Sequence, residues 1–159
     1  MPRALTALAA AMGFIAIGAT PASAHPDWQT YKANSNWDCG PSDNLSISKS
    51  VIFQTCVVTT PSKTHGQLVV VVSNRSTKTV ELKGAEFDSD IYGRWDGRSE
   101  LSGGFCGFHE LKAGQARGCF GNTVELPCGV GLRHSGFVFA NRAGKDETPP
   151  FSSDRLAGC

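Results

Sequence analysis

The sequence predicts an all-β protein built from many short strands. Apolar residues recur at strand spacing or in short runs, and nowhere do they recur at helical spacing over several turns. The 159 residues include 18 glycines and 8 prolines, which disfavour long helices. Short strands separated by frequent turns are typical of a β-sandwich or a β-barrel.

The first 24 residues have the layout of a secretory signal peptide. A basic start is followed by an apolar run over residues 4–17, and then by breakers and small residues that end at Ala24. The run is too short to span a membrane, and the sequence carries no lipid-attachment motif. We therefore expect cleavage after Ala24 and export of residues 25–159 to the extracellular space without a membrane anchor. His25 is then the N-terminal residue of the mature chain.

The charge of the chain gives no indication of a nucleic-acid partner. Lys and Arg number 15 against 14 Asp and Glu, and the two signs are interspersed along the sequence. Proteins that bind nucleic acid usually cluster their basic residues on one surface. The length of residues 25–159 suits one domain with its own core.

The six cysteines all follow the leader and predict three disulfide bonds. An even number of cysteines in an exported chain is typical of a disulfide framework, and none of these is spaced C-x-x-C as in many zinc and redox sites. The spacing does not by itself determine the pairing. We expect sequential pairing, because nearest neighbours close short loops. The expected bonds are Cys39–Cys56, Cys106–Cys119 and Cys128–Cys159.

Residues 25–49 are polar and rich in turn-forming residues. We expect them to form an extended arm that lies over the domain and is held by Cys39. Three isolated aromatic residues, Trp28, Tyr31 and Trp37, are expected to anchor the arm.

From residue 51 onward the pattern changes to that of strands. The run 68–74 is short and continuously apolar, as in a strand buried on both faces. We expect it to form a hairpin with 79–87 around a polar turn, and we expect Gly114 to supply the positive φ of a later turn. The expected strands are 51–58, 68–74, 79–87, 105–110, 115–121 and 136–140.

The order of these segments resembles the immunoglobulin-like sandwiches that are common in bacterial exported proteins. The resemblance is carried by the apolar strand LVVVVSN, the turn SNRS, the strand TVELKG and the turn LKAG. With FQTCVV and ARGCFGNT on either side of this core, the chain is also similar to small secreted actinobacterial proteins of uncharacterised function. The resemblance implies an immunoglobulin-like β-sandwich of about seven strands, and it implies no catalytic residues.

The segment 88–104 is the best candidate for a recognition surface. It combines Tyr92 and Trp95 with Arg94 and Arg98, among glycines and just before a cysteine. Aromatic and arginine side chains on a loop held by a rigid scaffold are typical of binding sites. Such a loop suits an extracellular protein or glycan ligand, and its arginines also suit an inhibitor of secreted proteases. The alternative is that the aromatic side chains pack onto the edge of the sandwich.

A mature N-terminal histidine is also a candidate copper ligand. The amine and Nδ1 of His25 could chelate Cu(II), and His65, His109 or His134 could complete the site. This histidine brace occurs in lytic polysaccharide monooxygenases and in periplasmic copper carriers. Against it, the chain is short for such oxygenases and Pro26 restricts the backbone beside the amine.

No other catalytic motif is present in the sequence. The serines lack the G-x-S-x-G elbow of many hydrolases, and the His-Glu pair at 109–110 lacks the second histidine of a zinc protease helix. The sequence therefore predicts a secreted, non-catalytic binding protein without a cofactor. Copper binding through His25 and protease inhibition through 88–104 are the alternatives.

Overall fold

Every regular element in the described part of the chain is a β-strand, which confirms the predicted all-β class. The computed structural model describes residues 27–92, 104–126, 131–140, 146–148 and 151–153, and only their backbone at 88–92, 131–133 and 151–153. The strands are β1 Trp37–Cys39, β2 Asp43–Leu45, β3 Ser48–Thr59, β4 His65–Asn74, β5 Val80–Leu82, β6 Gly84–Tyr92, β7 Phe105–Cys106, β8 His109–Leu111, β9 Ala116–Glu125, β10 Gly131–Phe139, β11 Asp146–Glu147 and β12 Phe151–Ser153.

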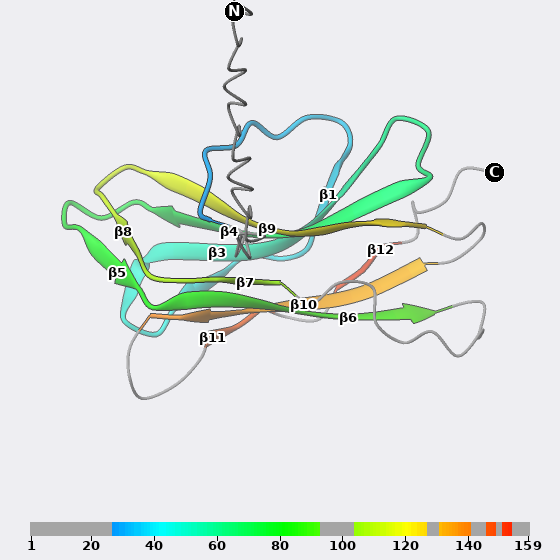
Figure 1. The fold of residues 1–159 in the computed structure, drawn as a ribbon. Coiled ribbons are helices and arrows are strands. Elements are labelled where there is room, and N and C mark those ends of the chain that lie inside the picture. Colours follow the sequence, from blue (N-terminus) through cyan, green and yellow to red (C-terminus); the bar gives the residue numbers. More distant parts are fainter. Residues whose placement is uncertain (1–26, 93–103, 127–130, 141–145, 149–150, 154–159) are drawn as a thin grey trace, which may run out of the picture.

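The long strands form two antiparallel sheets that lie in two layers (Figure 1). The first layer has the order β1-β3-β4-β9, with β2 also paired to β3. The second has the order β11-β10-β6-β7, with β12 also paired to β10. The short strands β5 and β8 pair with each other at the left end of the view (Figure 1). Within the described residues, no helix is long and apolar enough to cross a membrane.

The hydrophobic core lies between the two layers. Along β3 the alternate residues Val51, Phe53 and Val57 are buried in it, because successive side chains of a strand point to opposite faces. The second layer contributes Phe87 from β6 and Val138 from β10. The period-two pattern of β3 therefore places one face of this strand against the second layer.

Strand β4 is buried on both faces, as its four consecutive valines predict. Val70 and Val72 belong to the core between the layers, whereas Val69 and Val71 lie with Cys56 in a second cluster on the outer face. The partly buried aromatic residues packed against this outer cluster are Tyr31, Trp37 and Phe120.

The segment before β1 is anchored to the body, as predicted for the aromatic residues of the arm. Trp28 is buried in the main core, and the rings of Tyr31 and Trp37 stack at a centroid distance of 5.3 Å. Gln29 exchanges two backbone hydrogen bonds with Gly118 of β9, at 2.8 and 2.9 Å. From β1 onward, the expected arm consists of β1, β2 and the start of β3.

The predicted hairpin between 68–74 and 79–87 is wrong. Both edges of β4 are already paired, one with β3 and the other with β9, so that no edge is left for the following segment. The buried amide of Asn74 directs the chain away from the sheet, because its Nδ2 donates to the carbonyls of Lys78 and Leu111 at 2.8 and 2.9 Å. The polar segment after β4 therefore does not form a hairpin turn. It leads the chain out of the first layer, toward β5 and then β6 of the second layer.

Two predicted strands are each divided into two in the structure. The segment 79–87 breaks at Lys83 into β5 and β6, and 105–110 breaks at residues 107–108 into β7 and β8. The two halves pair separately, β5 with β8 and β6 with β7. The predicted turn before β9 is confirmed, since Gly114 has a φ of 73°.

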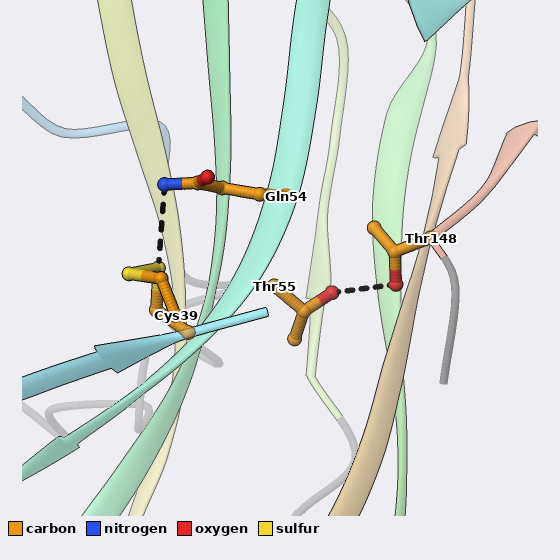
Figure 2. The surroundings of a disulfide bond; sticks show 5 residues. Cys39, Gln54, Thr55 and Thr148 are labelled. Carbon is orange, nitrogen blue, oxygen red and sulfur yellow. Dashed lines mark hydrogen bonds between the residues drawn. A yellow bond between two sulfur atoms is a disulfide. The ribbon is translucent and has the colours of Figure 1, made fainter. Parts of the chain in front are cut away.

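Two of the three predicted disulfide bonds are confirmed. Cys39 and Cys56 are directly opposite each other on β1 and β3, and Gln54 Nε2 lies 3.8 Å from the Cys56 sulfur (Figure 2). Cys106 of β7 and Cys119 of β9 join the second layer to the first, with a Cα–Cα distance of 5.8 Å. The third predicted pair lies outside the described residues and consists of Cys128 and Cys159.

A buried polar contact also connects the two layers. Thr55 of β3 points toward Thr148, and their hydroxyl oxygens are 2.8 Å apart (Figure 2). The backbone N–H of Gly136 donates to Thr148 Oγ1, and the N–H of Thr148 donates to the Gly136 carbonyl, each at 2.8 Å. These hydrogen bonds satisfy polar groups that would be costly to bury alone. They also bring β10 close to the first layer at Gly136.

Adding a side chain at this point of close approach should destabilise the fold. A Cβ atom at residue 136 would lie 2.6 Å from Thr55 Oγ1 and would also overlap Val70. We expect Gly136→Ala to lower the free energy of unfolding by roughly 1–3 kcal/mol, measured by urea denaturation. The matched control is Gly107→Ala, because a Cβ there meets nothing within 4 Å. Equal stability losses in the two variants would contradict the packing described here.

Candidate functional site

The predicted recognition segment 88–104 lies mostly outside the described residues. Arg94, Trp95 and Arg98 are outside them, and only the backbone of Tyr92 is described, as the last residue of β6. The structure therefore does not place these four side chains relative to one another.

The structure does describe how both ends of this segment are held. At the N-terminal end of the segment, β6 pairs with β10 up to its last residue, with Tyr92 opposite Gly131. Just after its C-terminal end, Phe105 pairs with Glu86 of β6. The next residue, Cys106, forms a disulfide bond with Cys119 in the other layer. The elements on either side of residues 93–103 are thus held by a strand ladder and by a disulfide bond.

Two exposed phenylalanines lie just after this segment, and sequence reasoning missed them. Phe105 is 44% exposed and Phe108 is 57% exposed. The Phe108 ring has the Lys83 ammonium 5.0 Å from its centroid, which is a cation–π contact, and Lys83 also pairs with Glu81 at 2.6 Å. The sequence signal for them is a pair of phenylalanines on either side of Cys106 and Gly107, within the segment predicted as one strand over 105–110. The two rings add apolar surface next to the anchored end of the loop.

His109 and Trp28 form a second cluster beside the same disulfide. The indole Nε1 of Trp28 donates to the carbonyl of Gly107 at 2.8 Å, and the Trp28 and His109 rings stack at a centroid distance of 6.0 Å. Burial lowers the pKa of His109, and the nearby Arg117 guanidinium lowers it further, while Glu110 acts in the opposite direction. His109 Nε2 is shielded from solvent and meets no hydrogen-bond partner. Burial and the Arg117 charge therefore both favour the neutral form of this ring.

The two other histidines that the structure places, His65 and His134, lie on different strands from His109. His65 is exposed at the start of β4, and its Nδ1 lies 3.1 Å from Thr64 Oγ1. His134 lies on β10 and is 1% exposed. His25 lies outside the described residues. Within the residues that the structure places, no group of three or more His, Cys, Asp or Glu side chains is arranged to hold a metal ion.

His134 is on the core-facing side of β10, two residues before Gly136 and four before Val138. Burial lowers its pKa to about 4, although the Asp38 carboxylate acts in the opposite direction. A histidine held neutral in the core serves packing, and its position between the layers makes it unsuitable as a ligand for an ion that enters from solvent.

Comparison with known proteins does not assign this chain to a family. No protein-family model matches it, and a search of curated proteins gives no match either.

Acid should destabilise the fold through His134. Its pKa of about 4 in the folded protein lies below the value of 6.5 for a solvated histidine, so the unfolded chain binds the extra proton between these two values. The stability that the neutral ring contributes above pH 6.5 is lost as the pH falls toward 4, by on the order of 3 kcal/mol.

Urea unfolding across this pH range measures the effect. His134→Leu should flatten the pH dependence, because it removes the titrating group, while His65→Gln should leave it unchanged. An identical slope in the wild-type protein and His134→Leu would contradict the assignment, since carboxylates would then account for the whole acid effect.

Proposed function

We propose that this chain is a secreted, non-catalytic protein whose 88–104 segment, which begins with the end of β6, binds a protein or glycan outside the cell. The observation that carries the proposal is the anchoring of the loop: β6 is paired with β10 as far as Tyr92, and Cys106 is bonded to the opposite layer. Binding sites are commonly built from loops on a rigid scaffold, because less conformational freedom is then lost on association. The exposed Phe105 and Phe108 extend the same surface.

The proposal includes export, because a ligand outside the cell can be reached only by an exported protein. Disulfide bonds of the kind seen here are typical of extracellular proteins, since reducing conditions in the cytosol keep most thiols free. The proposal includes cleavage of a signal peptide after Ala24. It also places the chain among the small secreted actinobacterial proteins that it resembles.

We further propose that the two layers form an immunoglobulin-like β-sandwich. Antiparallel sheets with a shared core, and a chain that crosses from β4 in one layer to β6 in the other, support this architecture. The inter-layer disulfide is consistent with it, because the disulfide in antibody domains also links the two sheets of the sandwich.

If the 88–104 segment is a binding site, substitutions in it should weaken ligand binding without changing the free energy of unfolding. Arg94→Ala and Trp95→Ala should each change the free energy of unfolding by less than about 0.5 kcal/mol, because surface side chains outside the core contribute little to folding. Retention on the best ligand of a glycan microarray should fall by at least tenfold in Trp95→Ala, since buried aromatic anchors contribute about 2 kcal/mol or more to binding.

Two controls are matched by residue type. Trp28→Ala should destabilise the fold by about 3–5 kcal/mol, because Trp28 is in the core, and Arg75→Ala should change neither property. A stability loss of several kcal/mol in Trp95→Ala would overturn the loop proposal, because Trp95 would then be a packing residue. If no glycan is retained and the wild-type protein instead inhibits trypsin in an Arg94-dependent manner, the loop is that of a protease inhibitor.

A further inference from the structure

The outer face of the second layer carries aromatic and acidic residues in one row across its strands. Strands β7, β6, β10 and β11 are neighbours in this order (Figure 1). Phe105 of β7 is opposite Glu86 of β6, and Glu86 is in turn opposite Phe137 of β10. Phe137 is opposite Glu147 of β11. Directly paired residues have their side chains on the same face, and Ala85, the residue before Glu86, lies in the core. The row therefore lies on the face that points away from the first layer.

The β5–β8 pair continues this face with two neighbouring carboxylates. Leu82 and Leu111 lie in the core, so Glu81 and Glu110, which alternate with them along their strands, point away from it. Both glutamates are exposed, and the register places one directly opposite the other. Like charges at directly opposite positions of a ladder destabilise it. A cationic group bound beside these carboxylates would reduce this repulsion.

The aromatic rings on this face are exposed, and one of them already contacts an ammonium group. The Lys83 ammonium lies 5.0 Å from the centroid of the Phe108 ring and 2.6 Å from Glu81 Oε2. The Phe105 ring lies against the next residue, Gly84, where an added Cβ would meet it at 2.8 Å. An ammonium beside both a ring and a carboxylate is held by a cation–π contact and by an ion pair. The same groups are suited to a Lys or Arg side chain of a partner.

The arrangement has the anatomy of a protein interface, with apolar rings surrounded by charged groups. Interfaces typically have an aromatic centre and a polar rim, and opposite charges on the two partners supply specificity. Two exposed rings within four residues also differ from apolar side chains that are scattered singly over a surface. The described carboxylates on the strands of this face are all glutamates. The surface is called the acidic–aromatic face below, and it comprises Phe105, Phe108, Glu81, Glu86, Glu110 and Glu147.

We propose that the acidic–aromatic face is a docking surface for a basic segment of a partner protein. Apolar side chains of the partner cover the rings of Phe105 and Phe108, and its Lys or Arg side chains pair with Glu86 and Glu110. The inference rests on the proposed binding function and names the chemistry of the partner, but it uses none of the residues of the 88–104 segment.

Selection of a random peptide library, displayed on phage, against the folded chain recovered from the culture medium tests this surface. The enriched peptides should carry Lys or Arg beside apolar residues, and they should bind less tightly as the salt concentration rises. Phe108→Ala should weaken the binding of such a peptide at least about tenfold, measured by fluorescence anisotropy. The matched control is Ile47→Ala, because Ile47 is also exposed but lies between β2 and β3 of the first layer.

Glu110→Gln distinguishes a role in binding from a role in folding. The substitution removes one of two opposed carboxylates, so it should raise the midpoint of urea unfolding while it weakens peptide binding. Glu125→Gln, on β9 of the first layer, should change neither property.

Each outcome supports or overturns the inference. The docking surface is overturned by enriched peptides without an excess of Lys and Arg, by the absence of any enriched peptide, or by equal affinities of Phe108→Ala and Ile47→Ala. Weakening by Trp95→Ala, with Phe108→Ala and Glu110→Gln unchanged, overturns the docking surface and leaves the proposed 88–104 site intact. The reverse pattern supports the docking surface and contradicts the 88–104 site.

Discussion

The disulfide bond between Cys106 and Cys119 is the constraint on which the arrangement of this molecule depends. It joins β7, which has only two residues, to the long strand β9 of the other layer. Two ladder residues cannot hold a sheet edge by their hydrogen bonds alone, so the covalent link keeps β7 beside β6. Both cysteines are fully buried, and the bond therefore adds to the core at the place where the layers close.

Two segments that are distant in the sequence are attached near this bond. The 88–104 loop returns to the body through Phe105 and Cys106, and Gly107, the next residue, accepts the hydrogen bond of Trp28. On the other side of the bond, Gly118 holds Gln29. One covalent link thus lies beside both the C-terminal end of the 88–104 segment and the Trp28–Gln29 segment.

The sequence predicted local properties well and strand partners poorly. The valines of β4 indicated burial on both faces, and the cysteine order indicated the two pairs that the structure describes, because burial and short loop closure are visible in a local pattern. The false hairpin after Asn74 shows the limit. Its turn residues fit a hairpin, but β9, far along the chain, occupies the edge of β4 that a hairpin partner would need. The approach of Gly136 to Thr55 and the stacking of His109 on Trp28 likewise join distant residues that no local pattern connects.

Hydrogen–deuterium exchange on a Cys106→Ala/Cys119→Ala double variant tests the central role of this bond most directly. The account predicts faster exchange at the backbone amides of Gln29 and Gly118, and along β7 and β8, with little change at the centre of β3 and β4. Loss of the other described bond, in Cys39→Ala/Cys56→Ala, should instead affect β1, because that bond joins neighbouring strands of one layer. Unchanged exchange at Gln29 and Gly118 in the first variant, or the same pattern in both variants, would contradict the claim that the Cys106–Cys119 bond holds β7 and the Trp28–Gln29 segment in place.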